Sequence, residues 1–199
     1  MSQIRNVAIL IFDDVEVLDF CGPFEVFSVT GRAKKEQPFN VFTVAEKSDP
    51  ILTRNHLSVN PRFTLAGSPA ADILVVPGGL GTRREMNNPA VLDWVKEAAS
   101  RAEVVLSVCT GALVLAKAGL LDGLTVTTHH VALELLKQTA PSCMVRADRR
   151  FVDNGKIITA AGISAGIDAS LHVVGRLLGR EVAQETARYM EYDWRPEAW

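Results

Sequence analysis

Short, largely apolar runs recur along the chain and are separated by stretches with helical periodicity. Such runs are typical of strands that are buried on both faces of a sheet. They span residues 7–12, 40–45, 72–77 and 104–108. A weaker run at 125–128 predicts a further short strand. Residues 51–63, which Asn and Pro interrupt, predict short strands or a hairpin.

Helices are predicted between these runs. We expect them at about 22–29, from Pro89 with Asn88 as N-cap, from Gly111 to Gly119, and at 130–138, 164–178 and 180–192. Pro23 is expected in the first turn of its helix, because proline lacks the N–H that interior positions donate. Residues 150–159 predict a hairpin around Asn154-Gly155, a pair well suited to a tight turn.

Alternation of strands and helices predicts an α/β sandwich with a mainly parallel sheet. The length of 199 residues fits one domain, 1–199. Ligands of such sheets bind beyond the carboxyl ends of the strands. The loops at 13–23, 78–81 and 109–111 each follow an apolar run. We therefore expect these loops to meet at one edge of the sheet.

Composition narrows the class of protein. The 21 basic and 23 acidic residues are mixed along the chain and leave a net charge of −2, so nucleic acid is not an expected partner. No apolar run is long enough to span a membrane, and the first residues lead into a strand rather than a signal peptide. The widely spaced Cys21, Cys109 and Cys143 match neither a disulfide framework nor a metal site. These features predict a cytoplasmic protein with reduced thiols.

Cys109 is the leading candidate for chemistry. It lies between the run at 104–108 and the helix after Gly111, the place of a nucleophile elbow, which would expose its thiol above the sheet. The helix N-terminus would favour the thiolate. The alternative is a small apolar residue that only fills space, which is the commoner role of a buried cysteine.

Two further segments could serve a cysteine nucleophile. Asp19, between Leu18 and Phe20, is either the N-cap of the next helix or an acid/base group beside Cys109, where its pKa would be raised. Glu16 competes for that role. Gly78-Gly79 is either a plain turn or a loop whose N–H groups face a substrate together with that of Thr110.

Other polar residues are weaker candidates. His129 and His130 follow the short strand at 125–128, and a structural role is the commoner outcome for either. Asp168 is explained most simply as a first-turn carboxylate of its helix.

Taken together, these segments resemble the ThiJ/PfpI superfamily over nearly the whole chain. The resemblance is carried by Asp19 with Gly22-Pro23, by 76–79, by 107–112, by 127–129 and by 161–168, which includes Ile163. It implies a flavodoxin-like three-layer fold related to class I glutamine amidotransferases, and a homodimer. Within the superfamily the chain looks most like isonitrile hydratases and the amidotransferase-like domain of AraC-type regulators. Thr110 stands where many other members have histidine.

The resemblance implies cysteine-dependent hydration of an isocyanide, a small-molecule substrate, to a formamide without metal or organic cofactor. Cys109 would form a thioimidate, and Asp19 would act as general acid/base. Thr110, Gly78, Gly79, Ile163 and His129 would surround the reacting atoms. The alternatives are a ligand or stress sensor with a reactive cysteine, and a glyoxalase- or deglycase-type enzyme acting on 2-oxoaldehydes. Direct DNA binding is not expected, because the chain stops at Trp199 where the regulators continue into a helix-turn-helix domain.

Overall fold

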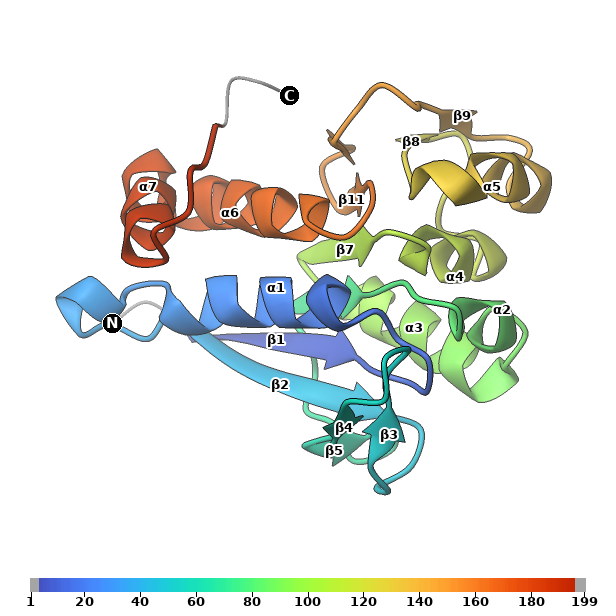
Figure 1. The fold of residues 1–199 in the computed structure, drawn as a ribbon, viewed down its shortest axis with the longest axis horizontal. Helices are drawn as coiled ribbons and strands as arrows, with labels where there is room; N and C mark the ends of the chain where they lie inside the picture. The colour runs from blue at the N-terminus through green and yellow to red at the C-terminus, as the bar shows by residue number, and fades with distance from the viewer. Residues whose placement is uncertain (1–3, 196–199) are drawn as a thin grey trace.

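A central sheet forms the middle layer of the protein (Figure 1). The computed structural model describes residues 4–195; the remaining ends of the predicted 1–199 domain lie outside the described residues. The strands of the sheet are β1 (Arg5–Leu10), β2 (Phe39–Ala45), β5 (Phe63–Thr64), β6 (Ile73–Val76), β7 (Val104–Val108), β10 (Phe151–Asp153) and β11 (Ile157–Ala160). Their order is β10-β11-β7-β6-β1-β2-β5. Only the pairing of β10 with β11 is antiparallel among these described strands, so the predicted mainly parallel sheet is confirmed.

The predicted strands are the buried ones. The sheet's central strands β1, β6 and β7 carry the apolar runs, and Ile9, Leu74 and Leu106 are fully buried. Two small pairs lie outside the sheet: β3 (Ile51–Leu52) with β4 (Ser58–Val59), and β8 (Thr125–Val126) with β9 (Met144–Val145). The expected hairpin around Asn154-Gly155 joins β10 to β11.

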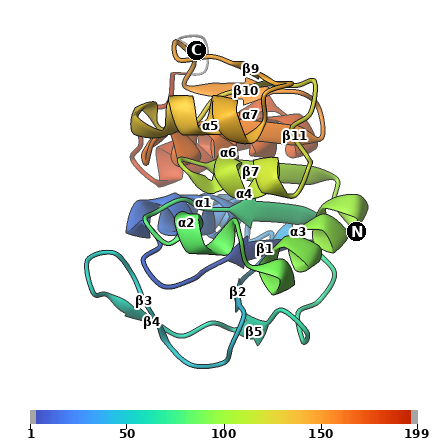
Figure 2. The ribbon, with the colours of Figure 1, turned by 90° about the vertical axis from the view of Figure 1, so that its right-hand side faces the viewer.

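Helices cover both faces of the sheet. They are α1 (Val17–Val29), α2 (Thr82–Glu85), α3 (Pro89–Arg101), α4 (Gly111–Lys117), α5 (Leu133–Thr139), α6 (Ala165–Leu178) and α7 (Arg180–Tyr189), with short 3-10 turns η1 (Arg32–Lys34) and η2 (His130–Ala132). The crossover from β1 to β2 runs in the opposite direction to that from β6 to β7. Because such crossovers are right-handed, α1 and α3 lie on opposite faces, as Figure 1 and Figure 2 show.

Two helix predictions need correction. The helix expected at 22–29 begins at Val17, so Pro23 lies in its interior rather than its first turn. Pro23 costs the helix one backbone hydrogen bond. Packing of α1 against the sheet outweighs this cost, so the helix continues through the proline. The short helix α2 was not predicted, whereas Asn88 caps α3 as expected, accepting the Ala90 N–H at 3.1 Å.

The sheet has a switch point between β1 and β6. From β1 the chain moves to β2 on one side and later returns to β6 on the other. Loops that leave adjacent strands in opposite directions open a crevice at their carboxyl ends. This edge faces the viewer in Figure 2. The segments after β1, β6 and β7 meet there, as the sequence predicts.

Candidate active site

Cys109 occupies the tight turn between β7 and α4. Its φ of 56° lies in the left-handed region that residues other than glycine rarely adopt. The turn is held in place by Cys109 N–H, which is donated to the carbonyls of Ala160 (3.1 Å) and Ala161 (2.9 Å). Gly111 allows the close approach to β6, because a Cβ there would lie 2.0 Å from the Val76 carbonyl oxygen. This is the geometry of a nucleophile elbow.

The thiol of Cys109 is buried, not exposed as predicted, with 6% of the residue accessible. Burial and the nearby Asp19 charge raise its pKa to about 12. The backbone N–H groups of Thr110 and Ile163 interact with the sulfur and lower the pKa, but by less. The Thr110 N–H at the helix N-terminus thus acts in the expected direction, but the net pKa shift is upward because desolvation is the larger effect.

Asp19 lies in the first turn of α1 and is fully buried. The N-cap alternative is wrong: Glu16 occupies that position and makes no side-chain cap. Asp19 Oδ2 accepts the Gly78 N–H at 3.0 Å, whereas the buried Oδ1 has no hydrogen-bond partner of ordinary geometry. Burial raises the pKa of this carboxyl to about 7, and interactions with Cys109 and Gly78 offset part of that rise.

Asp19 and Cys109 titrate as a coupled pair. Burial is the main cause that raises both pKa values, to about 7 and about 12; the Asp19 charge adds to the rise at Cys109, whereas the hydrogen bond with Cys109 lowers the pKa of Asp19. Between these values the pair holds one proton and one negative charge. When the proton resides on the carboxyl, the sulfur is a nucleophile with an acid beside it.

The Thr110 hydroxyl joins the elbow to the loop after β6. It donates to the Gly79 carbonyl at 3.1 Å and accepts the Gly79 N–H at 3.0 Å. Thr82 Oγ1 lies 3.1 Å from the same hydroxyl. The Gly78 and Gly79 amides, expected to face a substrate, thus have partners within the protein, namely Asp19 and Thr110. We call this set of contacts among Thr110, Gly79 and Thr82 the threonine lock.

Removing the Thr110 hydroxyl should break the hydrogen bonds of the threonine lock. In Thr110→Val the side chain keeps its shape, but the buried Gly79 N–H loses its acceptor. We expect the free energy of unfolding to fall by about 1–3 kcal/mol, measured by urea denaturation. Thr110→Ser, which keeps the hydroxyl, should stay close to wild type. A valine variant as stable as wild type would mean that the lock contributes nothing.

Ile163 and His129 complete the walls around the thiol. Ile163 has a left-handed φ of 51°, which directs its N–H to the Cys109 sulfur. His129 Nδ1 accepts the Val131 N–H at 3.3 Å, and its ring lies against Gly162. Burial and the neighbouring His130 lower the His129 pKa. The lowered pKa favours the neutral imidazole in this wall of the pocket.

A buried polar network anchors the loop that carries Ile163. Asp168, in the first turn of α6 as predicted, pairs with Arg150 and accepts the Tyr192 hydroxyl at 3.1 Å. Arg150 Nη2 also donates to Ser164 Oγ at 3.0 Å. The network ties the residue after Ile163 to α6 and to the C-terminal segment. Asp168 thus has a supporting role that the sequence did not reveal.

The thiol opens into a pocket of about 120 Å³. Its lining residues are Glu16, Arg54, Gly79, Leu80, Arg83, Cys109, Thr110, His129, Val131 and Ile163. The sequence analysis did not propose Arg54 or Arg83. Arg83 lies two residues after the Gly78–Gly81 loop, so its place at the same strand end was a usable signal. Arg54 comes from the β3–β4 turn, which carries no local signal. Within the described residues, no three His, Cys, Asp or Glu side chains are grouped to hold a metal ion.

The fold and the site define a flavodoxin-like α/β protein with a cysteine elbow facing a buried acid. The family model of the DJ-1/PfpI family matches residues 5–176, and the chain belongs to this family. It is 33% identical to isonitrile hydratase of Pseudomonas putida over 187 residues, 94% of this chain and 78% of that protein. It is 23% identical to the HTH-type transcriptional regulator GbdR of Pseudomonas aeruginosa, of which it spans 51%.

Solved structures share the fold. A ThiJ/PfpI family protein from Pseudomonas syringae superposes with a TM-score of 0.86 at 28% identity, over 98% of this chain and 78% of that one. Drosophila melanogaster DJ-1beta superposes with a TM-score of 0.83 at 21% identity, over 96% of this chain and all of that one, and shows the fold alone. No helix within residues 4–195 has both the length and the apolar character needed to cross a bilayer.

Proposed function

We propose that this protein hydrates isocyanides (isonitriles) to N-substituted formamides, with Cys109 as nucleophile and Asp19 as general acid/base. The observation that carries the proposal is the placement of the buried Asp19 carboxyl beside the buried Cys109 sulfur. An isocyanide needs a nucleophile and a proton at the same carbon atom. The 33% identity to an isonitrile hydratase supports the same reaction.

In the first step the Cys109 sulfur bonds to the terminal carbon of R–N≡C, and the Asp19 proton passes to that carbon. The product is a thioimidate, R–N=CH–S. Asp19, now a carboxylate, takes a proton from water as the hydroxyl adds to the carbon, and passes it to nitrogen. The hydroxyl proton then returns to Asp19 while the C–S bond breaks. This releases R–NH–CHO and restores the pair with its single proton.

The direct test is turnover of p-nitrophenyl isocyanide, followed by chromatography of the formamide. Formamide formation by purified protein supports the proposal. If a panel of isocyanides gives no product although Cys109 is alkylated readily, the ligand-sensor alternative replaces it. Turnover of methylglyoxal without turnover of isocyanides would instead indicate the glyoxalase-type alternative.

The pH profile follows from the pair. Below about pH 7 both groups are protonated and the sulfur is not nucleophilic; above it the pair has lost one proton and retains the other until about pH 12. We expect kcat/KM for hydration to rise about tenfold per pH unit below 7 and to level off above it. An activity maximum below pH 6 would contradict the shared proton.

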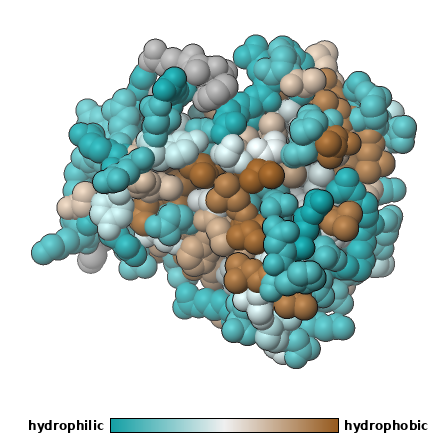
Figure 3. All heavy atoms as spheres, viewed as in Figure 1, coloured by the Kyte–Doolittle hydropathy of each residue, from teal (hydrophilic) through white to brown (hydrophobic). Residues whose placement is uncertain are grey.

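We also propose a homodimer. Figure 3 shows apolar residues gathered over α1 and the start of α6. On α1, Leu18 and Phe24 are 37% and 36% exposed, and Ile163, also 36% exposed, precedes α6. An apolar face of this kind is typical of a surface that pairs with a second copy. We expect sedimentation velocity to give a dimer and Leu18→Glu to shift it toward monomer. A monomeric wild type would refute this.

A further inference from the structure

Two arginines stand at the mouth of the Cys109 pocket without an acidic partner. Arg54 comes from the turn between β3 and β4, and Arg83 from α2. Arg83 Nη1 donates to two neutral oxygens, the Gly79 carbonyl at 3.3 Å and Thr82 Oγ1 at 3.0 Å. Within residues 4–195, neither guanidinium forms an ion pair. Unpaired guanidinium groups beside a pocket favour an anion, because each presents several fixed N–H donors.

The arginines act on the outer part of the pocket. Both lie close enough to His129 to contribute to the lowering of its pKa, after burial and His130. The groups that shift the Cys109 pKa are instead Asp19 and the Thr110 and Ile163 amides. Cys109 is buried, whereas Arg83 is half-buried and Arg54 is exposed, so the cysteine lies at the inner end and the arginines at the entrance. They are placed to bind part of a ligand and not to activate the sulfur.

The charge of the lining is unbalanced. Glu16 also lines the pocket, and it forms no ion pair with Arg54 or Arg83 in the described part of the chain. Two cations against one carboxylate leave a positive charge, which one anionic group of a ligand would match. Leu80, Val131 and Ile163 supply apolar surface in the same lining, and all three are exposed in this structure.

We propose that the substrate is a short isocyanide bearing a carboxylate, with the isocyano carbon at Cys109 and the carboxylate at Arg54 and Arg83. This substrate class rests on the hydration proposed above. The pocket of about 120 Å³ has room for an isocyano group and a few carbon atoms, since one water occupies roughly 30 Å³. The apolar side chains at the entrance would contact the linking carbons.

The first experiment does not depend on hydration. Iodoacetate and iodoacetamide both alkylate the Cys109 sulfur, forming an S–C bond as iodide leaves, and differ mainly in charge. Their rate ratio cancels differences in thiol ionisation. Arg83→Met and Arg54→Met should each lower the iodoacetate/iodoacetamide ratio about threefold, and the double variant about tenfold. Arg83→Lys should restore part of the loss.

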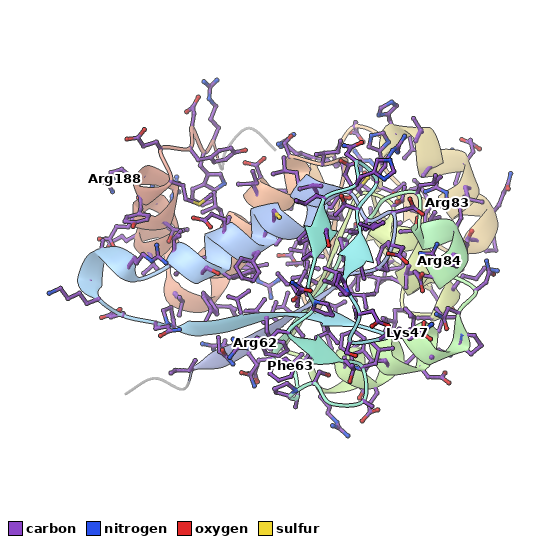
Figure 4. All side chains as sticks on the ribbon, turned by 60° about the horizontal axis from the view of Figure 1, so that its bottom comes forward. Lys47, Arg62, Phe63, Arg83, Arg84 and Arg188 are labelled. Atoms are coloured by element: carbon purple, nitrogen blue, oxygen red, sulfur yellow. The ribbon has the colours of Figure 1, made fainter. Side chains whose placement is uncertain are left out.

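Arg188→Met is the matched control for net charge. Arg188 is exposed on α7, at the end of the molecule opposite Arg83 (Figure 4). Its replacement should leave the ratio unchanged. If Arg83→Met and Arg188→Met change the ratio equally, the effect comes from net charge alone and the anion site is refuted.

The second experiment compares isocyanoacetate with its uncharged methyl ester as substrates. Wild type should show the larger kcat/KM for the carboxylate, and Arg83→Met should lower the carboxylate/ester ratio of kcat/KM about threefold, whereas Arg188→Met should leave this ratio unchanged. Equal kcat/KM values in wild type would overturn the proposed substrate class. If neither compound is hydrated but the alkylation ratio still depends on Arg83, the proposed hydration is refuted and the anion site is still supported.

Discussion

Cys109→Ala should lower the rate of formamide formation by about 10⁴-fold or more, to the level of a blank without protein. The sulfur makes the bond that the proposed reaction needs, and no neighbouring group can replace it. Wild-type protein mixed with an isocyanide and quenched with acid should carry one substrate mass on the peptide that contains Cys109. The alanine variant should carry none.

Cys109→Ser is the companion variant, because it keeps nearly the same volume. A serine hydroxyl would not ionise in this buried site, so the serine variant should be as inactive as the alanine variant. Thermal unfolding of both should stay close to that of wild type, which separates loss of chemistry from loss of structure. Formamide formation by either variant at more than a hundredth of the wild-type rate would exclude a covalent role for the sulfur.

Asp19→Asn should lower the same rate by about 10²–10⁴-fold, the range for loss of a positioned acid or base. Asparagine keeps the shape of the side chain but cannot deliver a proton to the substrate carbon. The Cys109 pKa should fall in this variant, because the negative charge of Asp19 is one of the causes that raise it. Alkylation by iodoacetamide at pH 8 should therefore become faster while hydration is lost.

Stability provides the control for that variant. The folded-state pKa of Asp19 is raised to about 7 from 3.8, so the folded protein binds more protons than the unfolded chain between these values. Stability from this group is therefore lost as pH rises through that window. Asp19→Asn removes the effect and should be at least as stable as wild type at pH 8. If hydration and alkylation instead slow together, Asp19 has only a structural role.

Much of the fold could be predicted because its strands are fully buried. A strand such as β6 or β7 shows a continuous apolar run only when both faces are covered, and that requires helices on each side. The start of α1 could not be predicted in the same way. Pro23 is a strong local signal for a helix start, but the real start at Val17 follows contacts with a distant segment: the Glu16 N–H is donated to the Gly78 carbonyl, and Val15 pairs with Gly79.

The sequence predicted which residues come together at the site better than it predicted their pKa values. Cys109 and Asp19 could be paired from the loop positions, since adjacent strand ends meet. The raised pKa of Asp19 is predicted from its place beside Cys109, but the main cause of the rise at both residues is burial, which no local pattern reports. Arg54 could not be predicted either. It lies in the turn between two short strands outside the main sheet, and only the packing of the whole chain brings this turn to the pocket.

The threonine lock has a consequence for chemoselectivity. Attack on an ester, amide or thioester places negative charge on oxygen, and such a charge needs free N–H donors. Here the Gly79 N–H is donated to Thr110 Oγ1 and the Gly78 N–H to Asp19. Addition to an isocyanide places the charge on carbon, where a proton suffices. With the Gly78 and Gly79 donors occupied, fewer N–H groups remain for an oxyanion, which would favour isocyanides over acyl compounds as partners of the cysteine.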